Sequence, residues 1–391
     1  MISARRFDYV IFLVFLLVLS LDPTGGFFHL KEILFVSLFV IGLLFTTIRR
    51  LSFNREIISV IVWLFLCSIY GITISYLTQY RLDEDFIKAY LKSTLFIFII
   101  LYLLTVDFKT IQKYLWINGI VMSLVTLVIF GIAVNNEIMF SQLYEMSKEH
   151  QFIRMGNREF LGYEVMGVML RAAPLMFFSL IYSMYSYEGK LKILFIALGL
   201  ASFLVAGSRT PPLLAIALFL LYLKDKKIGG GFFNAIFVFA AIIAVFFLIY
   251  KLAADTGEAS NELKYSNMSS YVADISEPSH FLFGAGIGSL FWAAGDGKYL
   301  SYTELTYFDI YRMLGVIVGT LYIIFVIYMP FYITFFSKKA TKILKRYALG
   351  YLAYMVLVGT NPFLFNSTGM LVLALGLRMM YEVTNRKKRY D

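Results

Sequence analysis

The chain consists mainly of long apolar stretches that are separated by short polar segments. A helix needs about 20 predominantly apolar residues to cross the hydrocarbon core of a bilayer. By this measure the pattern predicts an all-α, polytopic membrane protein with about twelve spans, in which residues 1–391 form a single integral membrane domain. The candidate spans lie near residues 7–21, 30–48, 56–77, 86–104, 114–134, 162–185, 191–207, 211–223, 231–252, 310–336, 345–361 and 363–383.

Lys and Arg are concentrated in alternate connections between these predicted spans. Because cytoplasmic loops of membrane proteins carry the excess of basic residues, we expect this set of connections, and both termini, to be cytoplasmic. The opposite side then carries two long loops, near residues 135–160 and 253–306. Most of the 35 basic residues lie near positions 5–6, 49–55, 109–113, 190–192, 224–227, 338–346 and 386–389.

The composition excludes several classes of protein. Hydrophobic residues make up 60% of the chain and charged residues 15%, with a mean hydropathy of +0.76, whereas soluble domains are about 25% charged. The net charge of +10 follows the predicted topology, so we expect no nucleic-acid partner. One Cys and three His argue against a disulfide framework and a metal centre. The absence of a Walker-type phosphate loop argues against an ATP-driven pump.

Two arginines stand out against this topology. Arg171 lies about ten residues into the span predicted from residue 162, near the bilayer centre. An arginine there costs at least ~2.5 kcal/mol and should face a wet cavity or the bundle interior. Two roles for Arg171 are open: it binds a substrate, or it forms a structural ion pair with Glu164.

Arg209 lies in a tight hairpin on the outer side, directly before a predicted helix that begins with Pro211 and Pro212. The free amides at such a helix start, beside a guanidinium, form an anion site. The alternative is an interfacial arginine that extends to lipid headgroups. Arg154 and Arg158 add positive charge to the same outer side.

The larger outer loop contains a glycine-rich motif, GAGIG, at residues 284–288. No strand–helix context for a dinucleotide site precedes it, so the glycines are expected to permit close backbone packing or the approach of a ligand. His280, just before the motif, is a candidate base or sugar ligand, or a structural side chain.

Glu304 is the first candidate for a catalytic carboxylate. Tyr302 and Tyr307 flank it and offer aromatic faces to sugars, while the carboxylate can accept a proton from a hydroxyl group. Asp309 and Arg312 lie three residues apart at the outer mouth of the next span, where they form a surface ion pair or contribute to the site.

Three segments resemble the O-antigen polymerase and ligase superfamily, and most closely the Wzy-type polymerases of surface polysaccharide. They read GSRTPPLL at residues 207–214, LFGAGIGSLF at 282–291 and ELTYFDIYRMLGVIVGTL at 304–321. The resemblance covers roughly residues 160–335, and the outer spans match in number and orientation only. Many relatives, ligases especially, have a His-Asn pair where this chain has SYTE at 301–304, which weakens the ligase interpretation.

The resemblance implies a GT-C-like membrane glycosyltransferase that polymerises undecaprenyl-pyrophosphate-linked oligosaccharide units at the periplasmic face of a bacterial inner membrane, without a metal or another cofactor. It implies pyrophosphate binding by Arg209 with Arg158 or Arg171, to which we add Arg312. Glu304 is the first choice of base and His280 the second, and Tyr302, Tyr307 and Asp309 are expected to contact the glycan. The implied partners are the lipid-linked glycan, the bilayer and a chain-length regulator protein.

Two alternatives remain open from the sequence. One is a ligase that transfers the glycan to a lipid or protein acceptor. The other is a flippase for lipid-linked oligosaccharides, which also has about twelve spans. Transporters of that kind usually have repeated halves and a binding site at the membrane midplane, whereas this chain has asymmetric long outer loops.

Overall fold

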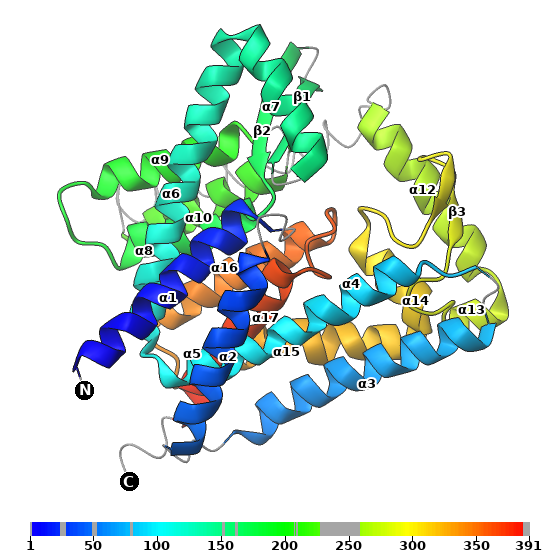
Figure 1. Ribbon diagram of the computed structural model, residues 1–391, viewed down its shortest axis with the longest axis horizontal. Coiled ribbons are helices and arrows are strands. Elements are labelled where there is room, and N and C mark those ends of the chain that lie inside the picture. The colour runs from blue at the N-terminus through cyan, green and yellow to red at the C-terminus, as the bar shows by residue number, and fades with distance from the viewer. Residues whose placement is uncertain are drawn as a thin grey trace. The chain divides into compact units, whose positions relative to one another are not determined.

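A computed structural model describes residues 2–23, 29–48, 53–78, 81–150, 153–160, 163–206, 208, 210–226 and 259–385. Over these residues the chain is mostly helical (Figure 1). Five helical segments are long and apolar enough to cross a membrane, which supports a membrane-embedded protein: Leu30–Ile48, Arg55–Thr78, Glu84–Thr105, Phe108–Asn135 and Thr306–Phe336. Shorter apolar helices cover Tyr9–Leu21, Ala173–Tyr185 and Lys192–Leu204. The span expected near 231–252 lies outside the described residues.

The chain divides into two compact units. Unit 1 comprises Met1–Ile41, Val106–Asp255 and Leu349–Tyr354, and unit 2 comprises Gly42–Thr105, Thr256–Ala348 and Met355–Asp391. The boundary passes through α2 (Leu30–Ile48) and α16 (Lys342–Val358), so each of these helices contributes to both units.

Unit 1 is built around the long helix α6 (Phe108–Asn135). Its other elements are α1 (Ile2–Leu21), α7 (Glu137–His150), β1 (Ile153–Phe160), β2 (Tyr163–Leu170), the short 3-10 helix η2 (Ala173–Leu175), α8 (Met176–Tyr185), α9 (Lys192–Leu204) and α10 (Thr210–Asp225). Helices α1, α8 and α9 all pack against α6.

Small and polar residues join the helices of unit 1. Asn118 on α6 donates to the Ser20 hydroxyl on α1 over 2.9 Å, and Ser202 on α9 donates to Ser123 on α6 over 3.2 Å. Gly119 lets α6 approach Ser179 on α8 so closely that a Cβ there would lie 2.6 Å from the serine Oγ. Such close approach and interhelical hydrogen bonding are what hold apolar helices together in lipid.

The prediction of a helical span over residues 162–185 is wrong in its first half. Residues Tyr163–Leu170 form β2, which pairs antiparallel with β1 from Ile153↔Leu170 to Phe160↔Tyr163, and the α-helix begins only at Met176. A short, mainly apolar run such as Val165–Leu170 fits a strand as well as a helix. Pro174 lies in the short 3-10 helix η2. A proline lacks the amide hydrogen and clashes with the preceding turn, so a continuous α-helix through this position is disfavoured.

Unit 2 contains most of the remaining helices that are apolar enough to span a membrane. Its elements are α3 (Arg55–Thr78), α4 (Glu84–Leu95), η1 (Phe96–Ile99), α5 (Ile100–Thr105), α12 (Ala259–Ile275), α13 (Pro278–Phe283), β3 (Phe291–Ala293), β4 (Lys298–Leu300), α14 (Thr306–Leu321), the π-helix η3 (Tyr322–Tyr328), α15 (Met329–Phe336) and α17 (Ser367–Thr384). Helix α17 is buried along most of its length and packs against η1, α5 and α15.

Both predicted outer loops contain regular structure. Residues 135–160 hold α7 and β1, and the described part of 253–306 holds α12, α13 and the β3–β4 hairpin. Tyr271 on α12 packs with Phe291 and Ala293 of β3 in a small hydrophobic core. The expectation of an all-α chain is therefore wrong for two short antiparallel hairpins.

The close contact of α6 with α8 is testable by substitution. We expect Gly119→Ala to destabilise the protein, because overpacking of a helix contact costs about 1–3 kcal/mol. Gly131→Ala on the same helix meets nothing within 4 Å and should instead stabilise by about 0.5–1 kcal/mol. Thermal unfolding in detergent micelles measures both, and equal shifts for the two variants would contradict the assigned packing.

Candidate functional site

Arg312 is a fully buried cation in the first half of α14. Its Nη1 donates to the Ser289 hydroxyl over 2.7 Å, its Nη2 donates to the Ser301 carbonyl, and its guanidinium lies 4.4 Å from the centre of the Phe291 ring. A buried guanidinium needs hydrogen-bond acceptors and aromatic contacts of this kind to offset the hydration that it has lost. Arg312 therefore ties three parts of the chain before α14 to that helix.

Asp309 is also buried, one turn before Arg312 on α14. It accepts hydrogen bonds from the Tyr271 hydroxyl and from the Thr303 amide, whose nitrogen lies 3.2 and 3.3 Å from the two carboxylate oxygens. The prediction of a surface pair between Asp309 and Arg312 is wrong, because both side chains are buried and each bonds to other neighbours.

Tyr271 connects α12 to this polar cluster. Its hydroxyl lies 2.8 Å from Thr303 Oγ1 in addition to its bond to Asp309. Burial, and then the charge of Asp309, raises the pKa of the Tyr271 phenol well above its usual range. The phenol therefore remains a neutral donor, and it fixes α12 to the start of α14.

The glycine-rich loop, residues 284–289, is bonded to a break in α14. Gly315 has φ +73° and interrupts the helix, which releases carbonyls that a continuous helix would use. The Ala285 amide donates to the Arg312 carbonyl over 2.7 Å and the Gly286 amide to the Met313 carbonyl over 3.1 Å. The loop thus completes the hydrogen bonding of the broken helix.

The glycines of this loop are required by both conformation and space. Gly284, Gly286 and Gly288 have φ of +82°, +91° and +86°, a region that favours glycine. A Cβ at Gly286 would collide with the backbone of Ser75 on α3. This arrangement bears out close backbone packing as one use of the motif.

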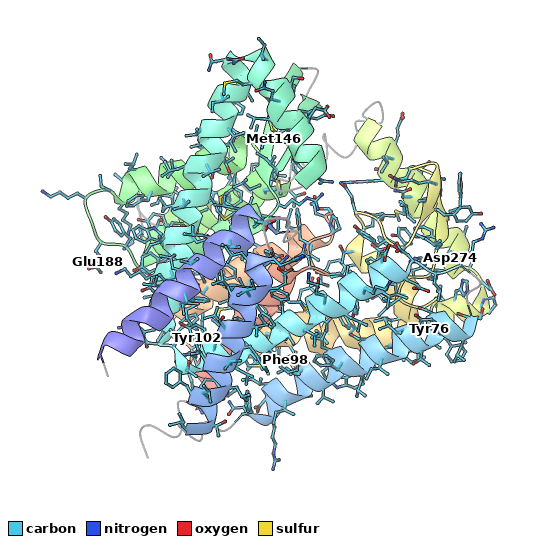
Figure 2. The ribbon with its side chains drawn as sticks, in the orientation of Figure 1. Tyr76, Phe98, Tyr102, Met146, Glu188 and Asp274 are labelled. Atoms are coloured by element: carbon cyan, nitrogen blue, oxygen red, sulfur yellow. The ribbon has the colours of Figure 1, made fainter. Side chains whose placement is uncertain are left out.

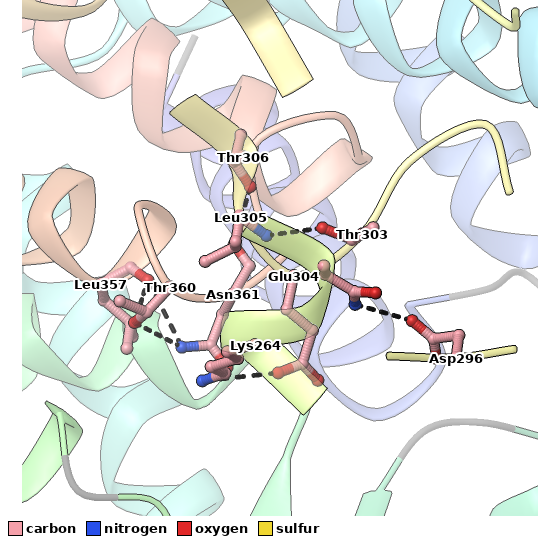
Figure 3. Close-up of polar contacts among 10 residues, drawn as sticks. Lys264, Asp296, Thr303, Glu304, Leu305, Thr306, Leu357, Thr360 and Asn361 are labelled. Carbon is pink, nitrogen blue, oxygen red and sulfur yellow. Dashed lines mark hydrogen bonds and ion pairs between the residues drawn. The ribbon is translucent and has the colours of Figure 1, made fainter. Parts of the chain in front are cut away.

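Glu304 and Tyr302 both keep part of their surface exposed. The Glu304 carboxylate lies 3.6 Å from Lys264 Nζ on α12, and the two side chains are 30% and 31% exposed (Figure 3). Tyr302 is 41% exposed and stacks on Phe86 of α4, with 4.8 Å between ring centres. A partly open carboxylate and an open aromatic face, two residues apart in the chain, are suited to contact with a polar ligand such as a sugar.

Tyr307 and His280 are engaged by the protein itself. The Tyr307 hydroxyl donates to the Met355 carbonyl over 2.7 Å and lies 3.1 Å from the Tyr328 hydroxyl. His280 Nδ1 lies 3.2 Å from the Asp274 carbonyl oxygen and 3.4 Å from its carboxylate, so it connects α13 to α12. Of the roles that the sequence left open for His280, these contacts support the structural one, in which it links two helices.

The other predicted arginines belong to unit 1. Arg171 lies half-buried in the turn after β2, so the expectation that it sits within a helix is wrong. Arg158 lies on β1, opposite Val165 of β2. Arg209 lies outside the described residues. In unit 2, Asp309 bonds to the Thr303 amide and Arg312 to the Ser301 carbonyl, so both buried side chains hold the backbone of the segment that carries Tyr302 and Glu304.

Four contributors to this cluster were not identified from the sequence: Tyr271, Lys264, Ser289 and Asp83. Asp83 accepts from the Ser301 hydroxyl over 2.7 Å, and its amide donates to the Gly288 carbonyl over 2.8 Å. It also caps α4 by accepting from the Phe86 amide, and an aspartate before an apolar helix is a recognisable cap signal. Lys264 and Tyr271 come from α12 and no local pattern marks them, whereas Ser289 directly follows the glycine-rich motif.

Within the described ranges, no group of three His, Cys, Asp or Glu side chains could hold a metal ion. Comparison of the chain with models of protein families and with curated proteins finds no match. A functional assignment therefore depends on the residues of the site and on the motifs that contain them.

The link between α12 and α14 is testable at Tyr271. We expect Tyr271→Phe to lower the free energy of unfolding by about 1–3 kcal/mol, because it leaves a buried carboxylate without one of its donors. Tyr302→Phe keeps its stacking on Phe86 and is expected to stay within about 0.5 kcal/mol of the parent protein. Thermal unfolding in detergent measures both, and a harmless Tyr271→Phe would remove the tyrosine from the network.

Proposed function

We propose that this protein is a bacterial inner-membrane glycosyltransferase that polymerises undecaprenyl-pyrophosphate-linked oligosaccharide units into O-antigen or capsular-type polysaccharide. In this proposal the chain is a GT-C-like bundle of about twelve spans with both termini in the cytoplasm. The reaction takes place at the periplasmic face and needs no metal.

One observation carries this proposal more than any other. Two of the three segments that resemble the polymerases, residues 282–291 and 304–321, are packed against each other in unit 2. Backbone hydrogen bonds from Ala285 and Gly286 to α14, and the side chain of Arg312 on Ser289, join them. Segments that share one site in a family are expected to meet in this way.

The proposed chemistry is a direct displacement at the anomeric carbon of the donor. A sugar hydroxyl of the acceptor attacks this carbon, its bond to the lipid-linked pyrophosphate breaks, and the hydroxyl proton passes to the Glu304 carboxylate. Arg209, with Arg158 or Arg171, balances the charge that develops on the departing pyrophosphate. Attack opposite the leaving group inverts the anomeric configuration.

Tyr302 and Arg312 have separate parts in this scheme. Tyr302 offers its exposed face to a sugar ring. Arg312 bonds to the Ser301 carbonyl and thereby holds the segment that carries Glu304 in place. A buried guanidinium with three protein partners is better suited to positioning this segment than to binding the pyrophosphate of a substrate.

Arg209 is the first residue to test. We expect Arg209→Ala to abolish long polysaccharide chains, since loss of one group that stabilises developing charge costs about 10²–10³-fold in rate. Arg209→Lys should fail as well, because a point charge does not replace a bidentate fork. The readout is the length distribution of surface polysaccharide on a gel.

The control for this test is Arg81→Ala, which removes an exposed arginine that lies over the Tyr299 ring and should keep normal chain lengths. Membrane levels of all variants are compared by immunoblot. Long chains with Arg209→Ala would exclude the arginine from the site. A deletion strain that accumulates single units on the cytoplasmic face would indicate a flippase, and one with long chains left on the lipid carrier would indicate a ligase.

Glu304 is tested against its ion-pair partner. We expect Glu304→Gln to reduce polymerisation by about 10²–10⁴-fold, the usual contribution of a general base. Lys264→Met breaks the same ion pair but keeps the carboxylate, and it should retain most of the activity. Polymerisation of purified lipid-linked units by the reconstituted variants measures the difference. Equal losses in both variants would mean that the ion pair, and not proton transfer, is what Glu304 supplies.

A further inference from the structure

A short segment of unit 2, residues 278–289, packs deep between two of the helices that are apolar enough to span a membrane. It comprises α13 and the glycine-rich loop, and it lies beside the carboxyl-terminal end of α3 (Figure 1). Polar residues precede it: Ser276 and Glu277 are both exposed. Its last helical turn is apolar, so the segment becomes more apolar as α13 proceeds.

Helix α3 gives one measure of its depth. The Tyr70 hydroxyl donates to the Phe283 carbonyl over 2.8 Å, and the Ile287 amide donates to the Gly71 carbonyl over 3.0 Å. Tyr70 precedes the end of α3 at Thr78 by eight residues, or about 12 Å along the axis at 1.5 Å per residue. A tyrosine on a helix also points back toward the amino terminus, which is further from the outer end.

Helix α14 gives an independent measure. A Cβ atom at Gly315 would collide with the Leu282 carbonyl, so the backbone of α14 is in direct contact with that of α13 at this point. Gly315 follows the start of α14 at Thr306 by nine residues, about 13 Å along the axis. Both helices therefore place Leu282 and Phe283 more than 10 Å below their outer ends, inside the stretch that is apolar enough to span.

The side chains of α13 at this depth are open. Phe281, Leu282 and Phe283 are 46%, 43% and 57% exposed. On α3, Leu66, Ile69 and Tyr76 are exposed too, the last of them near the outer end of the helix (Figure 2). The apolar surface of α13 thus lies at the level of the exposed apolar residues of a candidate spanning helix.

The backbone of the segment satisfies the condition for lying in a bilayer. Non-helical backbone is tolerated at membrane depth only where its polar groups bond to protein. The amides of Ala285, Gly286 and Ile287 all donate to helix carbonyls, and the Ile287 carbonyl accepts from the Ser75 hydroxyl over 2.5 Å. At these positions the backbone therefore has no unpaired group that would oppose its placement in lipid.

We infer that residues 278–289 form a re-entrant segment that dips into the outer half of the membrane, and that Phe281, Leu282 and Phe283 contact the hydrocarbon chains of the bilayer. The inference rests on the membrane placement in the proposed function and not on its glycosyl-transfer chemistry. The contact anchors the outer part of unit 2, with α12 and Glu304, at the membrane surface. That is where the anomeric centre of a lipid-linked donor would lie.

Single-cysteine spin labelling tests this inference. Cys67 is the only cysteine of the chain, so a Cys67→Ala background accepts one label at a time. The probe positions are Leu282→Cys and Phe281→Cys. Ile69→Cys on α3 serves as the lipid control and Ser269→Cys on the exposed face of α12 as the water control. The full-length protein is reconstituted in phosphatidylcholine–phosphatidylglycerol vesicles, and label accessibility to oxygen and to a water-soluble nickel chelate is compared.

We expect the labels at Leu282, Phe281 and Ile69 to be more accessible to oxygen than to nickel, with the reverse order at Ser269. Greater nickel accessibility at both α13 positions, with Ile69 still in lipid, would overturn the re-entrant segment alone. Low accessibility to both reagents on α13 would overturn it as well, because a protein would then cover the surface. If Ile69 itself were accessible to nickel, the membrane span and with it the proposed function would fail.

Discussion

Backbone groups that leave a helix within an apolar environment must find partners there, and this constraint governs the arrangement of unit 2. Gly315 breaks α14, and the carbonyls released before the break accept amides from the glycine-rich loop. The same loop bonds to Gly71 on α3. Because each unsatisfied group would cost several kcal/mol in hydrocarbon, the break and the loop are stable only together.

The buried polar cluster extends this arrangement from the backbone to the side chains. Arg312 sits three residues before the break and bonds to the loop at Ser289 and to the next segment at Ser301. Asp309, one turn earlier, holds Thr303 and Tyr271. These contacts fix residues 301–305 between two constrained ends, and Glu304 and Tyr302 project from that stretch with part of their surface open. A rigid scaffold with a partly open carboxylate is what the proposed transfer of a sugar requires.

Unit 1 is held together in a different way. Its helices meet through Gly119 and through hydroxyl and amide side chains such as Asn118 and Ser202, and its hairpin is closed by the β1–β2 ladder. Arg158 and Arg171 lie on and just after this hairpin.

The sequence by itself determined the properties that depend on composition and on the length of apolar runs: a mostly helical chain and long helices apolar enough to span a membrane. It also indicated that the long loop near residues 253–306, with its glycine-rich and apolar stretches, is more than a solvated tether. It did not distinguish a strand from a helix at residues 163–170, since a short and mainly apolar segment fits both until its pairing partner is known. It identified Glu304 and Arg312 as chemically notable. Only the tertiary structure decided that Arg312 is fully buried while Glu304 stays partly exposed, because burial depends on residues such as Ser289, Phe291 and Lys264 that meet them from distant positions in the chain.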